Sequence, residues 1–128
     1  MDTSYEKYLK AVEMLDFVDS AESADSKVKA VLGTLASRLH DREARMLIEH
    51  LPEPLTYERL VGHRVNITDI TTEQFIRDIR QQFRLDEDEA ILLIDTVLGV
   101  AKEDLDEETL REIENSLPED WARLIKEA

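Results

Sequence analysis

The chain contains no cysteine and only three glycines among its 128 residues. The absence of cysteine excludes disulfides, thiolate metal sites, iron–sulfur clusters and a cysteine nucleophile, and it is compatible with a reducing cytoplasm. The sequence also lacks a glycine-rich phosphate loop, a Gly-x-Ser-x-Gly elbow and a His-Glu-x-x-His zinc motif. We therefore predict no cofactor and no catalytic residues, and these absences favour a non-enzymatic protein over an enzyme.

Long apolar runs are also missing. The longest one, from Ala90 to Ile94, is far too short to span a bilayer. The first six residues lack the basic stretch and apolar segment of a signal peptide. We expect a soluble, cytoplasmic protein that is not bound to a membrane.

Basic residues are few, since 16 lysines and arginines stand against 30 aspartates and glutamates, for a net charge of −14. Residues 86–128 hold 15 of the acidic side chains and only 4 basic ones. Contacts of Lys and Arg with phosphates supply most non-specific affinity for nucleic acid, so the composition argues against nucleic-acid and anionic-membrane partners. It is compatible with an acidic decoy, in which residues 86–128 occupy a basic site on another protein.

The arginines that are present recur at helical spacing. Two such sets are Arg38, Arg42 and Arg45, and Arg77, Arg80 and Arg84. Each set is predicted to form a solvated helix face with helical salt pairs. The alternative is a stripe that receives an acidic partner, for example the C-terminal half of a second copy.

The densest carboxylate clusters, residues 86–89 and 104–108, do not follow the calcium-loop pattern. That loop needs a glycine at its sixth position, where this chain has Ile91 and Thr109. The three histidines do not form the Glu-x-x-His pairs of a di-iron bundle either. We predict no metal site and interpret the clusters as negatively charged first turns of helices.

The sequence repeats itself at a separation of 66 residues. When residues 24–55 are aligned with 90–121, nine positions are identical, including Val-Leu-Gly at 31–33 and 97–99 and Leu-Pro-Glu at 51–53 and 117–119. Two triplets that recur at one offset indicate an internal duplication. We expect two halves of three helices each, related by a pseudo-two-fold axis.

Capping residues predict where the helices begin. The spacing of a hydroxyl or carboxylate cap and its partner occurs at Thr3 and Glu6, Asp19 and Glu22, Thr71 and Gln74, and Asp86 and Glu89. Apolar residues then recur every three or four positions. Shorter helices are expected from Asp41 and from Asp106 up to each Leu-Pro step. The prediction is an all-α fold with about six main helices and one or two short ones.

At this length the two halves are expected to share one core in a single domain, residues 1–128. We place repeat 1 at about 3–55, a connection at about 56–70 and repeat 2 at about 71–125. Within the connection, Val65 to Ile70 is the only candidate for a strand, and we interpret it as an extended linker.

Three single residues carry further predictions. Gly33 and Gly99 occupy equivalent positions inside helices, where glycine costs about 1 kcal/mol relative to alanine, so we expect another helix to approach closely at each. Trp121 is the only tryptophan. It either closes the core or forms a partly exposed hot spot of a protein interface.

The segment from Val28 to Pro52 has the pattern apolar-x-x-Val-Leu, then Arg-Leu-x-x-x-Glu-Ala-x-x-Leu-x-x-x-Leu-Pro. With the second Leu-Pro-Glu ahead of Trp121, it resembles the prokaryotic domain-of-unknown-function family 2267, over about residues 5–125. The resemblance implies a small, all-helical, two-repeat domain without an established activity, and it brings no catalytic residues. After the first Leu-Pro step, members often have glycine and aromatic residues, whereas here only Tyr57 is aromatic.

The leading hypothesis is a non-enzymatic protein–protein interaction module whose partner is unknown. Long loops in compact domains are often functional, so the connection from Pro52 to Ile70 is predicted to carry binding. The candidate partner-binding residues are Tyr57, Arg59, His63, Arg64 and Trp121. The alternative is an enzyme or small-ligand protein with a site between the halves, near His40, His63 and Arg64. A homodimer is compatible with each hypothesis.

Overall fold

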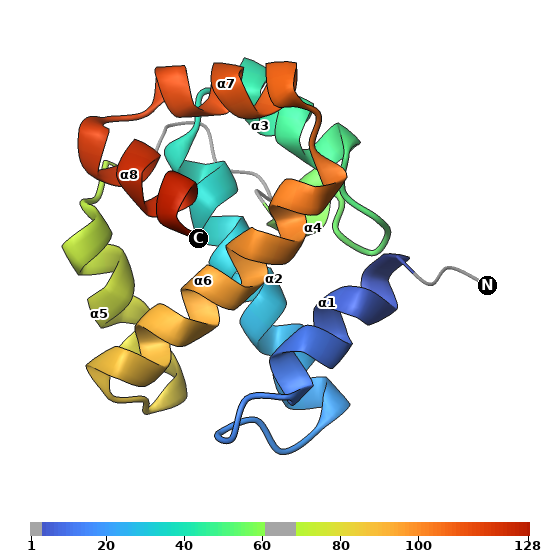
Figure 1. Cartoon of the computed structure of the whole chain (residues 1–128), viewed down its shortest axis with the longest axis vertical. Coiled ribbons are helices and arrows are strands. Elements are labelled where there is room, and N and C mark those ends of the chain that lie inside the picture. Colours follow the sequence, from blue (N-terminus) through green and yellow to red (C-terminus); the bar gives the residue numbers. More distant parts are fainter. Residues whose placement is uncertain (1–3, 61–68) are drawn as a thin grey trace.

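The computed structural model describes residues 4–60 and 69–128, and the regular structure in these residues is entirely α-helical (Figure 1). The helices are α1 (Ser4–Glu13), α2 (Ala21–Arg38), α3 (Asp41–Glu49), α4 (Tyr57–Leu60), α5 (Thr72–Phe83), α6 (Glu87–Asp104), α7 (Glu107–Ser116) and α8 (Glu119–Glu127). The all-α prediction is confirmed for the described residues.

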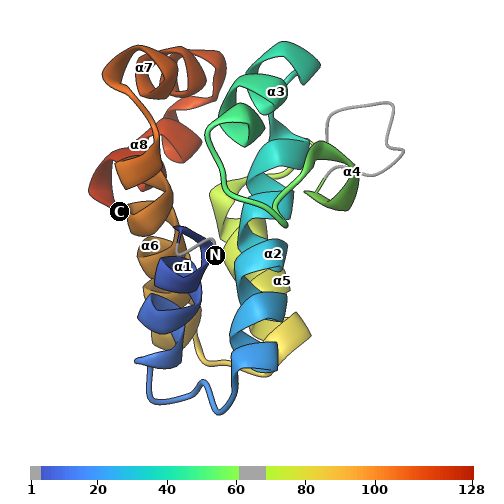
Figure 2. The same cartoon turned by 90° about the vertical axis from the view of Figure 1, so that its right-hand side faces the viewer.

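The two long helices α2 and α6 pack against each other, and α1 and α5 each contact both of them. Helices α3 and α7 lie side by side at one end of the molecule (Figure 2). Helix α4 packs on α2 and α3, and α8 packs on α5, α6 and α7. The apolar stripes of the long helices are fully buried at Val28, Leu32, Ile94 and Leu98, so one core joins all of these helices.

Helix α1 is held on both long helices by two tyrosines. The buried Tyr8 donates a hydrogen bond from its hydroxyl to the Asp104 carboxylate on α6, at 2.7 Å. Tyr5 donates to Asp25 on α2, and its ring stacks on that of Tyr8 with 6.2 Å between the ring centroids. A buried tyrosine usually needs such a partner for its hydroxyl, so this chemistry fixes the position of α1.

Helix α8 is anchored by Trp121, which is fully buried. Its ring stacks on Phe75 of α5 at 5.1 Å, and its Nε1–H donates to the Ile70 carbonyl oxygen at 2.9 Å. The adjacent Asp120 accepts a hydrogen bond from the Thr72 backbone N–H, also at 2.9 Å. The structure thus favours the core alternative for Trp121, since no part of the indole is exposed to a partner.

Two of the four predicted caps are in place. The side chains of Thr71 and Asp86 accept hydrogen bonds from the backbone N–H groups of Gln74 and Glu89, and Asp86 and Glu89 form a complete capping box. The prediction for α2 was wrong by one residue, because Ser20 and not Asp19 caps it, accepting from the Ser23 N–H at 3.0 Å. Thr3 lies outside the described residues.

The two helix-interior glycines differ in their surroundings. A Cβ on Gly33 would lie 3.3 Å from the Leu60 carbonyl oxygen of α4, which is a tight contact with backbone. A Cβ on Gly99 would come no closer than 4.0 Å to Ala128. The predicted close approach of another helix is therefore confirmed at Gly33, whereas at Gly99 the contact is an ordinary one.

Candidate functional site

Tyr57 begins the short helix α4 and faces the first turn of α3. Its hydroxyl donates a hydrogen bond to Asp41, and the Arg45 guanidinium lies 4.2 Å from the centre of its ring. Arg45 also donates from Nε to Asp41 at 2.9 Å. The three side chains therefore hold each other in place, and the half-buried ring of Tyr57 has a defined orientation.

The electrostatics of this group follow from the same contacts. The hydrogen bonds from Tyr57 and from Arg45 hold the pKa of Asp41 below its ordinary value. The carboxylate is therefore charged at neutral pH. A charged acceptor strengthens both hydrogen bonds, so the position of the Tyr57 ring depends on the ionised state of Asp41.

Beside this group lies an open hollow of about 470 Å³, lined by Arg42, Arg45, Met46, Ile48, Glu49 and Tyr57. We call it the Tyr57 hollow. Its apolar lining comes from Met46, Ile48 and the ring of Tyr57, and its charged residues lie around these. Large pockets with an apolar lining and a few polar groups are the usual form of binding sites.

The sequence did not point to Met46 and Ile48, although a signal was present. The buried residues of α3 are Glu43, Ala44 and Leu47. Met46 and Ile48 flank this buried face and are only half-buried. Ile48 packs against the edge of the core, and the accessible parts of Met46 and Ile48 form apolar surface that a partner can cover.

The structure brings only part of the predicted partner-binding set together. Tyr57 and Arg59 share helix α4, and the Arg59 side chain is exposed. His63 and Arg64 lie outside the described residues. Trp121 belongs to the buried contact between α8 and α5. Of the five predicted residues, only Tyr57 lines a cavity described here.

The first arginine stripe is paired within the protein. Arg42 contacts Glu43 at 2.8 Å and Glu112 of α7 at 3.3 Å. Arg38 contacts Asp69 at 3.2 Å, and Arg45 is bound to Asp41. The predicted salt pairs within the protein are therefore present for these three arginines, and the pair between Arg42 and Glu112 links α3 to α7.

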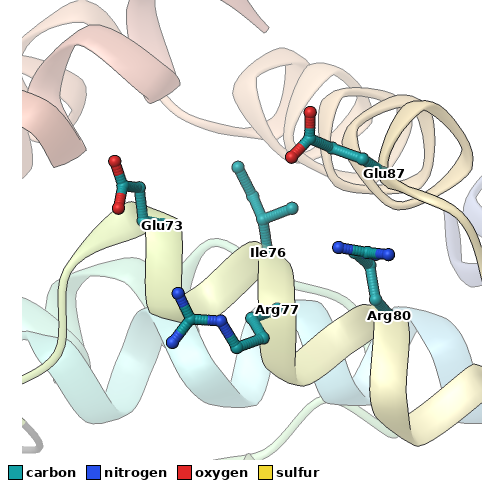
Figure 3. Close-up of a pocket in the computed structure, with 5 residues that line it drawn as sticks. All are labelled: Glu73, Ile76, Arg77, Arg80 and Glu87. Atoms are coloured by element: carbon teal, nitrogen blue, oxygen red, sulfur yellow. The ribbon is translucent and has the colours of Figure 1, made fainter.

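The second stripe is different. Arg77 and Arg80 are exposed and line two cavities along α5, and neither side chain forms an ion pair or hydrogen bond with another described residue. One of the cavities, of about 330 Å³, is also lined by Glu73, Ile76 and Glu87 (Figure 3). Ile76 stands between the two carboxylates, and Glu87 reaches over from α6. Arg84 ends α5 in the left-handed conformation, with φ at 56°.

Within 4–60 and 69–128, no three His, Asp or Glu side chains are arranged to hold a metal ion. Over the same residues, every helix is too short or too polar to cross a membrane.

These features define a small all-α domain with charged and apolar hollows on its surface. The chain belongs to the family described as "Uncharacterized conserved protein (DUF2267)", whose profile matches residues 5–124. The family assignment confirms the resemblance seen in the sequence. A comparison with curated proteins gives no significant match.

Proposed function

We propose that the protein is a non-enzymatic interaction module that binds another protein at the Tyr57 hollow. The observation that carries this proposal is the arrangement of Tyr57, Asp41 and Arg45 beside the apolar side chains of Met46 and Ile48. Tyrosine and arginine are enriched among the residues that contribute most to protein interfaces. Their fixed orientation lowers the entropy lost on binding.

The chemistry of the hollow defines its partner. Met46, Ile48 and Tyr57 offer an apolar surface, whereas both arginines at its edge are paired with carboxylates of this chain. The partner is therefore a protein segment that inserts a large apolar side chain. The charged residues at the edge of the hollow mainly orient that segment. Methionine adapts its shape to such an insert.

The proposal is tested by capturing proteins from a lysate of the source organism and quantifying them by mass spectrometry. The bait proteins are the unaltered chain, Tyr57→Ala, Tyr57→Phe and Met14→Ala. Met14 is 84% exposed and does not line the hollow, so Met14→Ala is the matched control for loss of exposed apolar surface. Tyr57→Phe keeps the ring and removes the hydrogen bond to Asp41.

A partner of the hollow is expected to be lost from Tyr57→Ala, with binding about 30-fold weaker, because truncating a hot-spot residue costs at least about 2 kcal/mol. Met14→Ala retains the partner, and Tyr57→Phe weakens binding less than Tyr57→Ala does, because the ring remains but Asp41 no longer holds it. Capture of the same proteins at the same level by Tyr57→Ala and Met14→Ala would show that the hollow is not the binding surface.

The two other hypotheses differ in what they predict. The acidic decoy is supported by the charge of residues 86–128 and predicts a complex that weakens strongly between low and moderate salt. The ligand site between the halves would involve His40, His63 and Arg64. His40 is exposed just before α3, and the other two lie outside the described residues. The buried apolar faces of α2 and α6 favour the surface hollow over that alternative.

We also propose that the two halves are related by a pseudo-two-fold axis. The long helices α2 and α6 have 18 residues each, and each is followed by a shorter helix that begins at an equivalent repeat position. The mutual contacts of α2 with α6 and of α3 with α7 support the same relation. The helices after the Leu-Pro steps differ in length, since α4 has 4 residues and α8 has 9.

A further inference from the structure

One face of α5 is rich in hydrogen-bond donors. Arg77, Arg80 and Gln81 follow the helical spacing i, i+3 and i+4, so their side chains emerge on the same side. Together with Leu85 they line a cavity of about 320 Å³ that no carboxylate lines. We call these four residues the α5 donor face, and it lies on a different helix from the Tyr57 hollow.

The two arginines of this face have no partner among the described residues. In contrast, Arg42, Arg45 and Arg123 each form an ion pair at 3.0 Å or less. Arg84 and Arg111 also form no ion pair with a described residue, but neither of them lines this cavity. The side chains of Arg77 and Arg80 are thus available to a ligand.

Two carboxylates, Glu73 and Glu87, lie near this face without forming an ion pair with it. They line the neighbouring cavity, which Arg77 and Arg80 also line (Figure 3). Each lies in the first turn of its helix, where the positive end of the helix dipole favours a negative side chain. They flank the donor face and leave its own cavity free of negative charge.

We infer that the α5 donor face binds a phosphate group, as a phosphate monoester or as inorganic phosphate. Each guanidinium presents five N–H donors in a planar fork, and the Gln81 amide adds two. A carboxylate offers two oxygens to these donors, whereas a phosphate monoester offers three and carries about two negative charges. Two neighbouring arginines, each able to donate two hydrogen bonds, suit this larger oxyanion.

The acidity of the rest of the molecule limits the size of the ligand. A nucleic acid would bring a row of further phosphates against a surface that is mostly negative. A single phosphate group contacts only the donor face, with Leu85 beside it. The ligand is therefore a small phosphorylated molecule or free phosphate, and not a polyanion.

The inference is tested by nuclear magnetic resonance on the ¹⁵N-labelled full chain. Inorganic phosphate, phosphoserine and succinate are titrated separately at constant ionic strength, and the arginine side-chain Nε–Hε signals are followed. The variants are Arg77→Gln and Arg80→Gln, which remove one guanidinium group each, and Arg77→Lys, which keeps the positive charge. Arg111→Gln is the matched control, because Arg111 is also exposed and lines none of these cavities.

Phosphate is expected to shift the signals of Arg77 and Arg80 in a saturable way. Affinity falls about tenfold or more in both glutamine variants and less in Arg77→Lys, whereas Arg111→Gln binds as the unaltered chain does. Tighter binding of phosphoserine than of phosphate identifies a monoester as the ligand. The assignment is overturned if phosphate leaves these signals unchanged, if it shifts Arg111 equally, or if succinate binds as tightly. Backbone spectra of each variant verify that the fold is intact.

Discussion

At the scale of single residues, arginines of similar spacing have different roles because their neighbours differ. Arg45 lies within reach of Asp41, and the pair orients the ring of Tyr57. Arg77 has Glu73 at the favourable i−4 position, and both side chains line one cavity, yet they form no ion pair. A surface ion pair contributes at most about 1 kcal/mol to stability. Small differences in side-chain conformation therefore decide whether an arginine pairs within the chain or stays available to a ligand.

The two helix-interior glycines provide a prediction at this scale. Gly99→Ala is expected to raise the free energy of unfolding by about 1 kcal/mol, because alanine favours the helix and the added methyl group has room. Gly33→Ala gains the same helix propensity, but its methyl group meets the Leu60 carbonyl oxygen at 3.3 Å. Its net effect is therefore smaller or destabilising, since α4 must shift.

Urea denaturation of both variants, followed by circular dichroism, measures these effects. The two positions are equivalent in the repeat, so each variant is the control for the other. An equal gain in stability at both positions would show that α4 does not restrict Gly33.

At the scale of elements, α4 depends on packing and not on local preference. A helix of four residues is not stable alone, and this one is held by the buried side chains of Leu55 and Leu60. Four residues make only about one helical turn, so the sequence shows no apolar periodicity there and predicts only a connection. Tyr57 was nevertheless predicted as a candidate binding residue, because it is the one aromatic residue in that segment.

The start of α7 offers a prediction on pH. Hydrogen bonds from Thr109, above all from its backbone N–H, hold the pKa of Asp106 below its ordinary value of 3.8. The ionised form is thus favoured in the folded state. The stability that this group contributes is present above pH 3.8 and is lost as the pH falls through the lower, folded-state pKa.

Asp106→Asn removes the negative charge and keeps the helix cap, because asparagine caps a helix about as well as aspartate. The unaltered protein is expected to be more stable than Asp106→Asn at neutral pH, and this difference shrinks below pH 3.8. Urea denaturation at several pH values provides the comparison. A difference that stays constant with pH would mean that the carboxylate is not the titrating group.

At the scale of the whole molecule, the regular parts of the fold could be predicted and the contacts between distant segments could not. The caps at Thr71 and Asp86 are local, and both were found in the sequence. At α2 a serine and an aspartate compete for the same role, and the neighbouring Ser20 caps the helix. The burial of Trp121 depends on Phe75, which lies in another helix.

The candidate site shows the same limit. Tyr57 could be proposed from its place in a long connection, but Asp41, Arg45 and Met46 belong to a helix earlier in the chain. Their proximity depends on how α4 folds back onto α3. Spacing along the sequence carries no information on that contact.

The most direct test of the account is site-specific photocrosslinking in the source organism. A photoreactive phenylalanine analogue replaces Met46 inside the Tyr57 hollow, and in a second strain it replaces the exposed Met14. If the hollow binds a protein partner, position 46 crosslinks to one defined protein and Tyr57→Ala abolishes the product, while position 14 gives no such product. The same products from both positions, or none from position 46, would contradict the proposal that the hollow binds a protein partner.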